Sequence, residues 1–309
     1  MMPNAHPIRT LTESPFSGTL FDQSETTPRF YFQSLGSGSS GNCSLLISGS
    51  EALILDAGIG IRTFLKRALI LKDSPIKPMG ILITHDHGDH IRGAARIAHK
   101  LGVPIYTTRE VSDTLRRWSL SSKYDLTAYL MEIEADTPFG IGRFDVTAFD
   151  VPHDATRNVG FSIKAEAGTF SLITDIGQVT DRVRQAIRES NYLVFESNYD
   201  EEMLRTGSYA YQLKERISGG AGHLSNRRAG ETICEEMHPG LKFVALCHLS
   251  GNNNTPGLAM EHFSGHLRAN GISAYRLACE GLSLGEESGD GLATTVILRD
   301  TVSSIFSLE

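Results

Sequence analysis

The segment HDHGDH at residues 85–90 carries four side chains that can bind a metal ion: His85, His87, Asp89 and His90. Imidazole nitrogens and carboxylate oxygens both suit zinc, and a loop lets alternate residues converge where a regular strand would point them to opposite faces. By residue frequencies alone, this pattern should occur in roughly fewer than one chain in a thousand. A solvated polar loop is the competing interpretation, but loops seldom gather four such side chains. The segment therefore predicts a metal centre.

Further candidates follow short apolar runs that read as strands. Asp56 comes after ALIL, Asp175 lies in LITDIG and His248 lies in LCHLS, while His153 lies in VPHD and by itself could be an ordinary loop histidine. We expect Asp56 to orient the 85–90 segment through hydrogen bonds, because carboxylates commonly support the residues that bind a metal.

Hydrophobic periodicity predicts the elements that position these residues. Strands are expected at 30–35, 44–48, 52–55, 80–84, 144–149, 159–165, 169–174, 192–196 and 242–247, and helices at 62–71, 91–101, 179–189, from Ser225 or Asn226 to Met237, and 255–269. Residues 85–90 would then form a loop between a strand and a helix. Strands dominate both halves of the chain, which favours an α/β fold of two sheets with helices outside over a doubly wound parallel sheet.

Composition limits the remaining possibilities. The chain of 309 residues has a net charge of −7 and only 4 cysteines, with no C-x-x-C pair, so neither a disulfide framework nor a structural zinc knuckle is expected. Residues 1–29 are polar and lack sustained periodicity, and we expect a disordered or loosely attached tail before one domain at 30–309. No secretory signal or membrane-spanning run is visible, so a cytoplasmic location is expected. The sequence indicates no oligomeric state.

In motif order, the sequence resembles the metallo-β-lactamase superfamily from about residue 30 to its end. The resemblance implies a four-layer αββα sandwich with two divalent metal ions, zinc or manganese, at one edge. It further implies one ion held by His85, His87 and His153, a second held by Asp89, His90 and His248, and Asp175 bridging both. An aspartate in the bridging position disfavours the hydrolysis of β-lactams, because many true β-lactamases of this superfamily have a cysteine ligand.

Glu196, in YLVFESNY, and His223, in GHLSN, resemble the glutamate and extra histidine of the phosphodiesterase members, notably ribonuclease Z. This resemblance implies a catalytic dyad in which Glu196 orients His223 beside the scissile phosphate. A carboxylate can fix the imidazole tautomer and favour its protonated form. A capping glutamate and a surface histidine are the competing interpretation.

Four longer segments resemble the YycJ (WalJ) branch of small nucleases: SLGSGSSGNC, FESNYDEEML, GHLSNRRAG and HLSGNNNTPGLA. That branch implies a 5′-to-3′ exonuclease acting on nucleic acid, specifically DNA, with Asp89 orienting the attacking water. One alternative is a small-molecule metallohydrolase acting on a cyclic phosphodiester, thioester or lactone. Another is a partner-binding protein without activity, which the complete ligand set disfavours.

Three further features of the sequence can each be interpreted in two ways, one functional and one structural. Residues 36–42 either present backbone N–H groups to a phosphate or form a tight connection between strands. Trp118 and Tyr124 either stack on a base or cap a core. The remaining feature is a group of cations that either contact a nucleic-acid backbone or are simply solvated: Arg205, Lys214, Arg216, Arg227 and Arg228.

Overall fold

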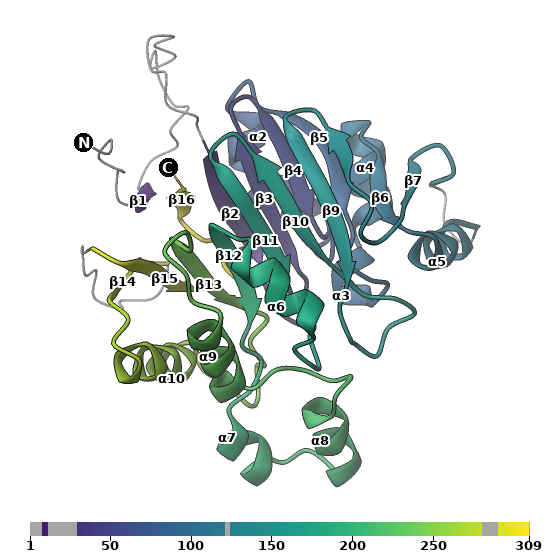
Figure 1. Cartoon of the computed structure of the whole chain (residues 1–309). Helices are drawn as coiled ribbons and strands as arrows, with labels where there is room; N and C mark the ends of the chain where they lie inside the picture. The colour runs from purple at the N-terminus through teal and green to yellow at the C-terminus, as the bar shows by residue number, and fades with distance from the viewer. Residues whose placement is uncertain (1–7, 12–29, 121–123, 280–289, 309) are drawn as a thin grey trace, which may run out of the picture.

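The computed structural model describes residues 8–11, 30–120, 124–279 and 290–308. Two eight-stranded sheets lie face to face, and helices cover the outer face of each sheet (Figure 1). The predicted αββα sandwich is therefore confirmed. Within the described ranges, every helix is too short or too polar to cross a membrane.

The first sheet combines antiparallel and parallel pairing. Its strands are β1 (Arg9–Leu11), β2 (Phe30–Gly36), β3 (Cys43–Ser48), β4 (Glu51–Leu55), β5 (Lys77–Leu82), β6 (Ile105–Thr108), β7 (Leu130–Ile133) and β16 (Ile305–Ser307). They follow the order β1-β16-β2-β3-β4-β5-β6-β7, antiparallel as far as β4 and parallel from β4 to β7. The carboxyl ends of β4 and β5 therefore meet at one edge.

The second sheet has a similar plan. Its strands are β8 (Phe139–Ile141), β9 (Phe144–Asp150), β10 (Val159–Ala165), β11 (Gly168–Ile173), β12 (Tyr192–Glu196), β13 (Phe243–Cys247), β14 (Ala274–Arg276) and β15 (Leu292–Val296). The order is β14-β15-β13-β12-β11-β10-β9-β8, and β11, β12 and β13 run parallel. Their three carboxyl ends also lie at one edge.

The helices form the two outer layers and the connections near the strand ends. They are α1 (Ile61–Arg67), α2 (Leu69–Lys72), α3 (Gly88–Ile91), α4 (Ala94–Leu101), α5 (Arg109–Leu120), α6 (Asp181–Arg188), α7 (Glu201–Thr206), α8 (Tyr211–Ser218), α9 (Asn226–Glu235) and α10 (Pro256–Ala269). Thr180, Ser225 and Thr255 cap α6, α9 and α10, because each hydroxyl accepts a hydrogen bond from a first-turn N–H.

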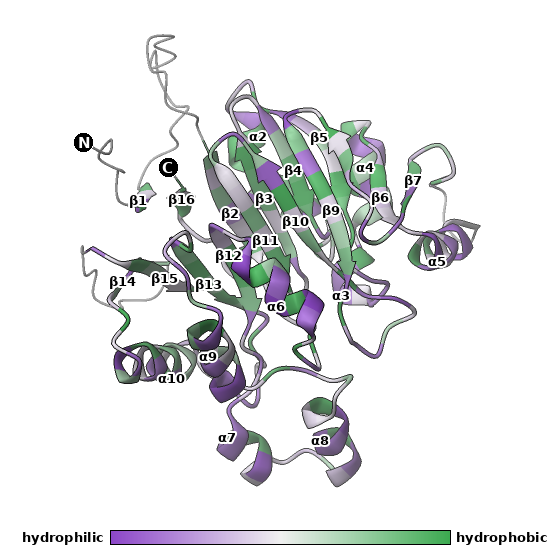
Figure 2. Ribbon diagram, in the orientation of Figure 1, coloured by the Kyte–Doolittle hydropathy of each residue, from purple (hydrophilic) through white to green (hydrophobic). Residues whose placement is uncertain are grey.

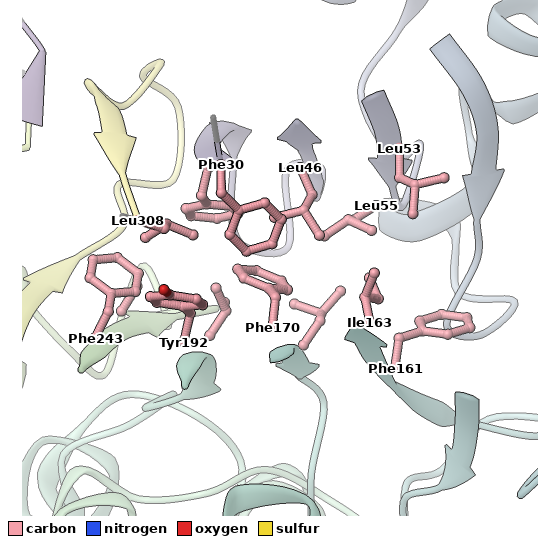
Figure 3. Close-up of a cluster of buried hydrophobic side chains, with 14 of the residues drawn as sticks. Phe30, Leu46, Leu53, Leu55, Phe161, Ile163, Phe170, Tyr192, Phe243 and Leu308 are labelled. Atoms are coloured by element: carbon pink, nitrogen blue, oxygen red, sulfur yellow. The ribbon is translucent and has the colours of Figure 1, made fainter. Parts of the chain in front are cut away.

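A hydrophobic core fills the space between the sheets (Figure 3). Phe32 of the first sheet and Phe170 of the second pack with ring centroids 5.3 Å apart. Every residue of β2 and β12 is buried, as expected for strands covered on both faces. Separate clusters pack each sheet against its helices, whose outward sides are hydrophilic (Figure 2).

Two local predictions need correction near the 85–90 segment. The segment is not wholly a loop, because α3 begins at Gly88 and includes Asp89 and His90. The helix expected at 91–101 starts only at Ala94. Gly93 separates the two helices, and a Cβ atom there would lie 2.1 Å from the carbonyl oxygen of Ile59. Close packing against this loop therefore interrupts the helical pattern.

The expected loose tail also needs correction where the structure describes it. Residues 9–11 form β1, which pairs with β16 at the edge of the first sheet. Ile8 is 5% exposed, and its carbonyl accepts a hydrogen bond from Tyr275 Oη at 3.0 Å. The buried side chain of Ile8 and the backbone pairing with β16 hold this short segment against the sheet. Residues 1–7 and 12–29 of the predicted tail lie outside the described residues.

Candidate metal centre

Four candidate residues immediately follow or lie just beyond the carboxyl ends of parallel strands. Asp56 follows β4, His85 lies beyond β5, Asp175 lies beyond β11 and His248 follows β13. Asp56, Asp175 and His248 have positive φ angles of 55°, 53° and 54°. Such left-handed backbone is uncommon outside glycine, although aspartate and histidine tolerate it better than most residues. Each strand thus ends in a sharp turn that directs its last side chain into the site.

The first cluster consists of His85, His87 and His153. Their ring centroids lie 4.7 Å apart for His85 and His87, 5.2 Å for His85 and His153, and 5.0 Å for His87 and His153. One nitrogen from each ring lies within 4.8 Å of the others. Three imidazoles at this spacing can hold one divalent cation.

The second cluster consists of Asp89, His90 and His248. Asp89 Oδ2 lies 3.7 Å from His90 Nε2 and 3.6 Å from His248 Nε2. The ligand atoms again lie within 4.8 Å of one another. The structure therefore brings together the residues that the sequence assigned to a second ion.

Asp175 lies between the two clusters and is almost completely buried. Its Oδ1 is 3.6 Å from Nε2 of His153, and its Oδ2 is 3.2 Å from Nε2 of His90. Oδ1 also lies 3.4 Å from Nδ1 of His248, so the carboxylate as a whole lies against both clusters. The backbone carbonyl of Asp175 accepts a hydrogen bond of 2.8 Å from Asn158, which holds the turn in place.

The histidine nitrogens fit bound metal ions. Nε2 atoms of His85, His153 and His248 are buried without a hydrogen-bond partner among the described residues. His153 Nδ1 lies 2.9 Å from the carbonyl oxygen of Gly222, which can only accept, so Nδ1 carries the proton and Nε2 presents a lone pair. Orphaned buried acceptors are costly, and a cation would satisfy them.

Supporting contacts fix the orientation of His90 and Asp89. Asp56 Oδ2 lies 2.8 Å from His90 Nδ1, while its Oδ1 accepts a hydrogen bond from the Thr84 N–H at 2.9 Å. This is the role expected for Asp56. Asn42 was not predicted to take part, yet its Nδ2 lies 3.3 Å from Asp89 Oδ2 and its N–H donates to the Asp89 carbonyl.

Residues 36–42, which contain Asn42, form a tight connection instead of an open phosphate nest. The N–H of Ser37 donates to the Arg299 carbonyl, the N–H of Gly38 to Asn42 Oδ1, and the N–H of Gly41 to the Gly38 carbonyl. These donors are therefore already used within the protein. The loop acts on the site through the Asn42 side chain.

Glu196 and His223, far apart in sequence, are in direct contact. Glu196 Oε1 lies 2.9 Å from His223 Nδ1, and Oε2 accepts hydrogen bonds from the N–H groups of Ile176 and Leu224 at 3.1 Å and 3.0 Å. Glu196 is fully buried, whereas the His223 side chain is 21% exposed. The glutamate is thus rigidly held, and its histidine partner reaches solvent.

Charge stabilises ionised carboxylates in this buried site. Burial would raise the pKa of Asp175, but the nearby imidazoles of His248 and His90 hold it well below its usual range. The pKa of Asp89 falls to about 2, because the charges of the nearby imidazoles of His248 and His90 outweigh burial. Burial lowers the pKa of His85, which keeps that imidazole neutral. The same carboxylates raise the pKa of His90 and raise that of His248 to about 10, and a divalent cation bound here would take the place of those protons.

A cleft opens beside the second cluster. Its volume is about 210 Å³, and its walls include His223, His248, Ser39, Tyr209 and Arg216. Arg216 also pairs with Asp154, whose Oδ1 lies 3.4 Å from His153 Nε2. The cleft therefore gives a substrate access to His223 and to the edge of the metal centre.

Most cations predicted near the dyad are engaged with the protein itself. Arg205 pairs with Glu202, and Arg228 pairs with Glu231. Arg227 pairs with Glu201 and Glu231, while Lys214 Nζ donates to the Arg205 carbonyl. These contacts favour structural roles over nucleic-acid binding, and only Arg216 of the group lines the cleft.

Sequence reasoning missed Asn42, Asp154 and Asn198. Asn198 Nδ2 donates to the His248 carbonyl at 2.7 Å and helps hold its strained turn. All three lie inside or next to motifs singled out in the sequence, since Asp154 follows His153 and Asn198 follows Glu196 by two positions. Proximity to a motif was the available signal, but which neighbour contacts the site depends on loop geometry.

Two facing sheets with outer helices, and a histidine and aspartate cluster at their carboxyl edge, define a metallo-β-lactamase-fold hydrolase. The family model for the "Beta-lactamase superfamily domain" matches residues 52–244. The chain belongs to this superfamily and is a metal-dependent hydrolase.

Named relatives support the same assignment. The chain is 33% identical to "Exodeoxyribonuclease WalJ" of Streptococcus pneumoniae, over 74% of this chain and 85% of the relative. It is 32% identical to "Exodeoxyribonuclease YycJ" of Bacillus anthracis, over 78% and 90%. The solved metallo-β-lactamase-fold protein YhfI of Bacillus subtilis matches with a TM-score of 0.61 at 16% identity, over 89% of this chain and 99% of that chain. The predicted resemblance to the WalJ/YycJ nucleases is confirmed.

Proposed function

We propose that the protein is a nuclease that uses two divalent ions, zinc or manganese, and removes nucleotides from DNA in the 5′-to-3′ direction. The observation that carries this proposal is the contact of 2.9 Å between Glu196 and His223 at the wall of the cleft. The names of the WalJ and YycJ relatives support DNA as the substrate and an exonuclease as the activity.

The two clusters have the donor set for two ions. His85, His87 and His153 would hold one ion, Asp89, His90 and His248 the other, and Asp175 would contact both. When bound, divalent cations supply positive charge to a substrate oxygen and make hydroxide available near neutral pH.

Hydrolysis requires an oriented water and a proton for the leaving oxygen. The Asp89 carboxylate is 19% exposed and can accept a hydrogen bond from the attacking water. As the new P–O bond forms, the attacking water loses a proton to solvent. The bond from phosphorus to the leaving sugar oxygen breaks, and that oxygen takes a proton from His223 Nε2. His223 Nδ1 is engaged by Glu196, which leaves Nε2 as the donor. Burial lowers the pKa of His223, but the Glu196 charge and hydrogen bond raise it more, which favours the protonated donor.

The size of the cleft supports a second candidate, a small-molecule metallohydrolase. A cleft of about 210 Å³ is small, and its one arginine, Arg216, pairs with Asp154. A cyclic phosphodiester, thioester or lactone would fit such a space. An exonuclease also meets this limit, because only the terminal nucleotide must enter.

Labelled substrates separate the two candidates. Metal-reconstituted protein should be incubated with single-stranded and double-stranded DNA and RNA carrying a label at either the 5′ or the 3′ end. Early release of a mononucleotide from the 5′ end of DNA supports the proposal. Intact strands together with rapid hydrolysis of a cyclic dinucleotide or a lactone would favour the small-molecule hydrolase.

A further inference from the structure

A second cavity lies behind α3, apart from the catalytic cleft. It measures about 520 Å³, within the range of about 300–1,000 Å³ typical of ligand pockets. Residues of α1, α4 and α5 contribute to its wall, as do residues that follow α5. The lining consists of Gly60, Ile61, Ile91, Arg92, Ala95, Arg96, Leu115, Trp118, Ser119, Tyr124 and Leu126.

The aromatic residues of this pocket do not simply cap the core. The Trp118 side chain is 48% exposed, although it lies on α5 beside the buried Leu115. The Arg96 guanidinium lies 5.9 Å from the centroid of the Tyr124 ring. The exposed indole offers a flat surface on which a nucleobase can stack, whereas the Tyr124 ring already contacts Arg96 and, at a centroid distance of 5.4 Å, the His99 ring.

The charge of the pocket is positive, against the net charge of −7 of the chain. The lining contains Arg92 and Arg96 and no carboxylate. In the described part of the chain, neither arginine pairs with an acidic side chain, whereas arginines near the dyad such as Arg227 do. Arg92 donates to a backbone carbonyl and Arg96 lies over an aromatic ring, and neither contact neutralises the positive charge, which favours a ligand that carries phosphate.

One backbone contact links the wall of the pocket to the wall of the catalytic cleft. Ser39 lines the cleft beside His223, and the next residue, Ser40, accepts a hydrogen bond of 3.3 Å from Arg92. Both serines are exposed. Because Arg92 lines the pocket, a strand leaving the cleft would pass these serines before it reached Trp118.

From these observations we propose that the pocket binds single-stranded DNA a few nucleotides from the scissile bond. A base stacks on Trp118, and Arg92 and Arg96 contact the adjacent phosphates. This inference rests on the proposed nuclease function and adds to it a site that selects strands over isolated small phosphodiesters.

The sequence supplies a built-in reporter, because Trp118 is its single tryptophan. Metal-loaded protein should be titrated with a short oligothymidylate whose phosphorothioate linkages slow cleavage, while tryptophan emission is recorded. Stacking should quench the emission with saturation, and thymidine dinucleotide should quench only at much higher concentration because it offers fewer stacking and phosphate contacts. Unchanged emission at concentrations of oligomer that saturate the enzyme would overturn the proposal.

Variants separate a binding site from a structural role. Trp118→Ala should raise KM for a long single strand about tenfold or more, whereas Trp118→Phe should remain within a few-fold. Both should hydrolyse bis(nitrophenyl) phosphate at the wild-type rate, which shows that the fold and the metal centre are intact. Equal KM values for Trp118→Ala and wild type on the long strand would refute the inference.

Arginine variants test the phosphate contacts. Arg96→Gln should weaken binding of the oligomer and reduce its dependence on salt. Arg268→Gln is the matched control, because Arg268 is an exposed arginine on α10, far from α5 (Figure 1). An equal effect of both substitutions would argue against a specific site. A further outcome is that the wild type cleaves no nucleic acid while the oligomer still quenches Trp118 emission. In that case the proposed nuclease function would be wrong, and the proposal that the pocket binds single-stranded DNA would be supported.

Discussion

Oε1 of Glu196 lies 2.8 Å from Nδ1 of His248, so the carboxylate expected to orient His223 also contacts a proposed metal ligand. The sequence predicted only the contact with His223. The shared oxygen couples the proton donor to the metal centre. Substitutions at Glu196 should therefore disturb both.

We expect Glu196→Gln to weaken metal binding roughly 10- to 100-fold, the usual loss when the partner of a metal-binding histidine is changed. Turnover should fall as well, because His223 loses a charged partner. Competition with a chromogenic chelator measures the affinity. Wild-type affinity in this variant would show that the contact with His248 has no influence on the ligand.

His223→Ala should retain the metal ions but lose on the order of 10²-fold or more in turnover of DNA. The loss should be smaller with a nitrophenyl phosphodiester, because its leaving group needs little protonation. Kinetics with both substrates, together with elemental analysis, test this. Release of metal from the variant, or DNA cleavage at the wild-type rate, would exclude the proposed donor.

Asp175→Ala should empty both metal sites, since this carboxylate lies against residues of both clusters. Elemental analysis should find two ions in the wild type and a large loss in the variant. Asp300→Ala, at an exposed position, is the control. Metal should also raise the melting temperature of the wild type by mass action, and a chelator should reverse that rise.

Removal of residues 1–11 should lower the melting temperature by a few degrees, on the order of 5 °C, whereas removal of 1–7 should not. The longer deletion takes away Ile8 and β1, which pairs with β16. Metal content should be unchanged because β1 is an edge strand. Calorimetry of the two truncations decides the matter, and identical curves would mean that β1 contributes no stability.

Glu236 should stabilise the fold at neutral pH and lose this effect in acid. Burial would raise its pKa, but hydrogen bonds from Arg184 and Arg188 lower it. A carboxyl whose folded pKa is depressed stabilises above its ordinary pKa and loses that contribution as pH falls through the folded value. Urea unfolding of Glu236→Gln should therefore differ from wild type at neutral pH and converge in acid. Glu235→Gln, nearby and more exposed, should change less.

The sequence predicted the strands near the site well because they are short apolar runs with polar residues at their ends. The run at 192–196 coincides with β12, and Ser225 caps α9 as expected. The elements around β6, α5 and β7 were missed, since their patterns mix apolar and polar residues over a few positions. The pairing of β1 with β16 could not be predicted either, because these strands are nearly 300 residues apart and local sequence patterns do not show which distant strands pair.

For the site, residue type and motif order predicted which side chains converge, but not how they are supported. Asn42 can reach Asp89 because residue 58 is glycine. A Cβ atom at this position would lie 1.5 Å from the carbonyl oxygen of Asp89 and would push the two loops apart. Such a contact depends on two loops packing together. A single sequence carries no signal for it.

The left-handed backbone at Asp56, Asp175 and His248 sets stability against activity. Each such position costs on the order of 1 kcal/mol or more, a cost that glycine would avoid. Glycine would remove that backbone cost, but it would also remove a proposed metal ligand or, at Asp56, the partner of His90, and with it the stabilisation that bound metal gives. Any programme that seeks a thermostable form must hold these residues constant.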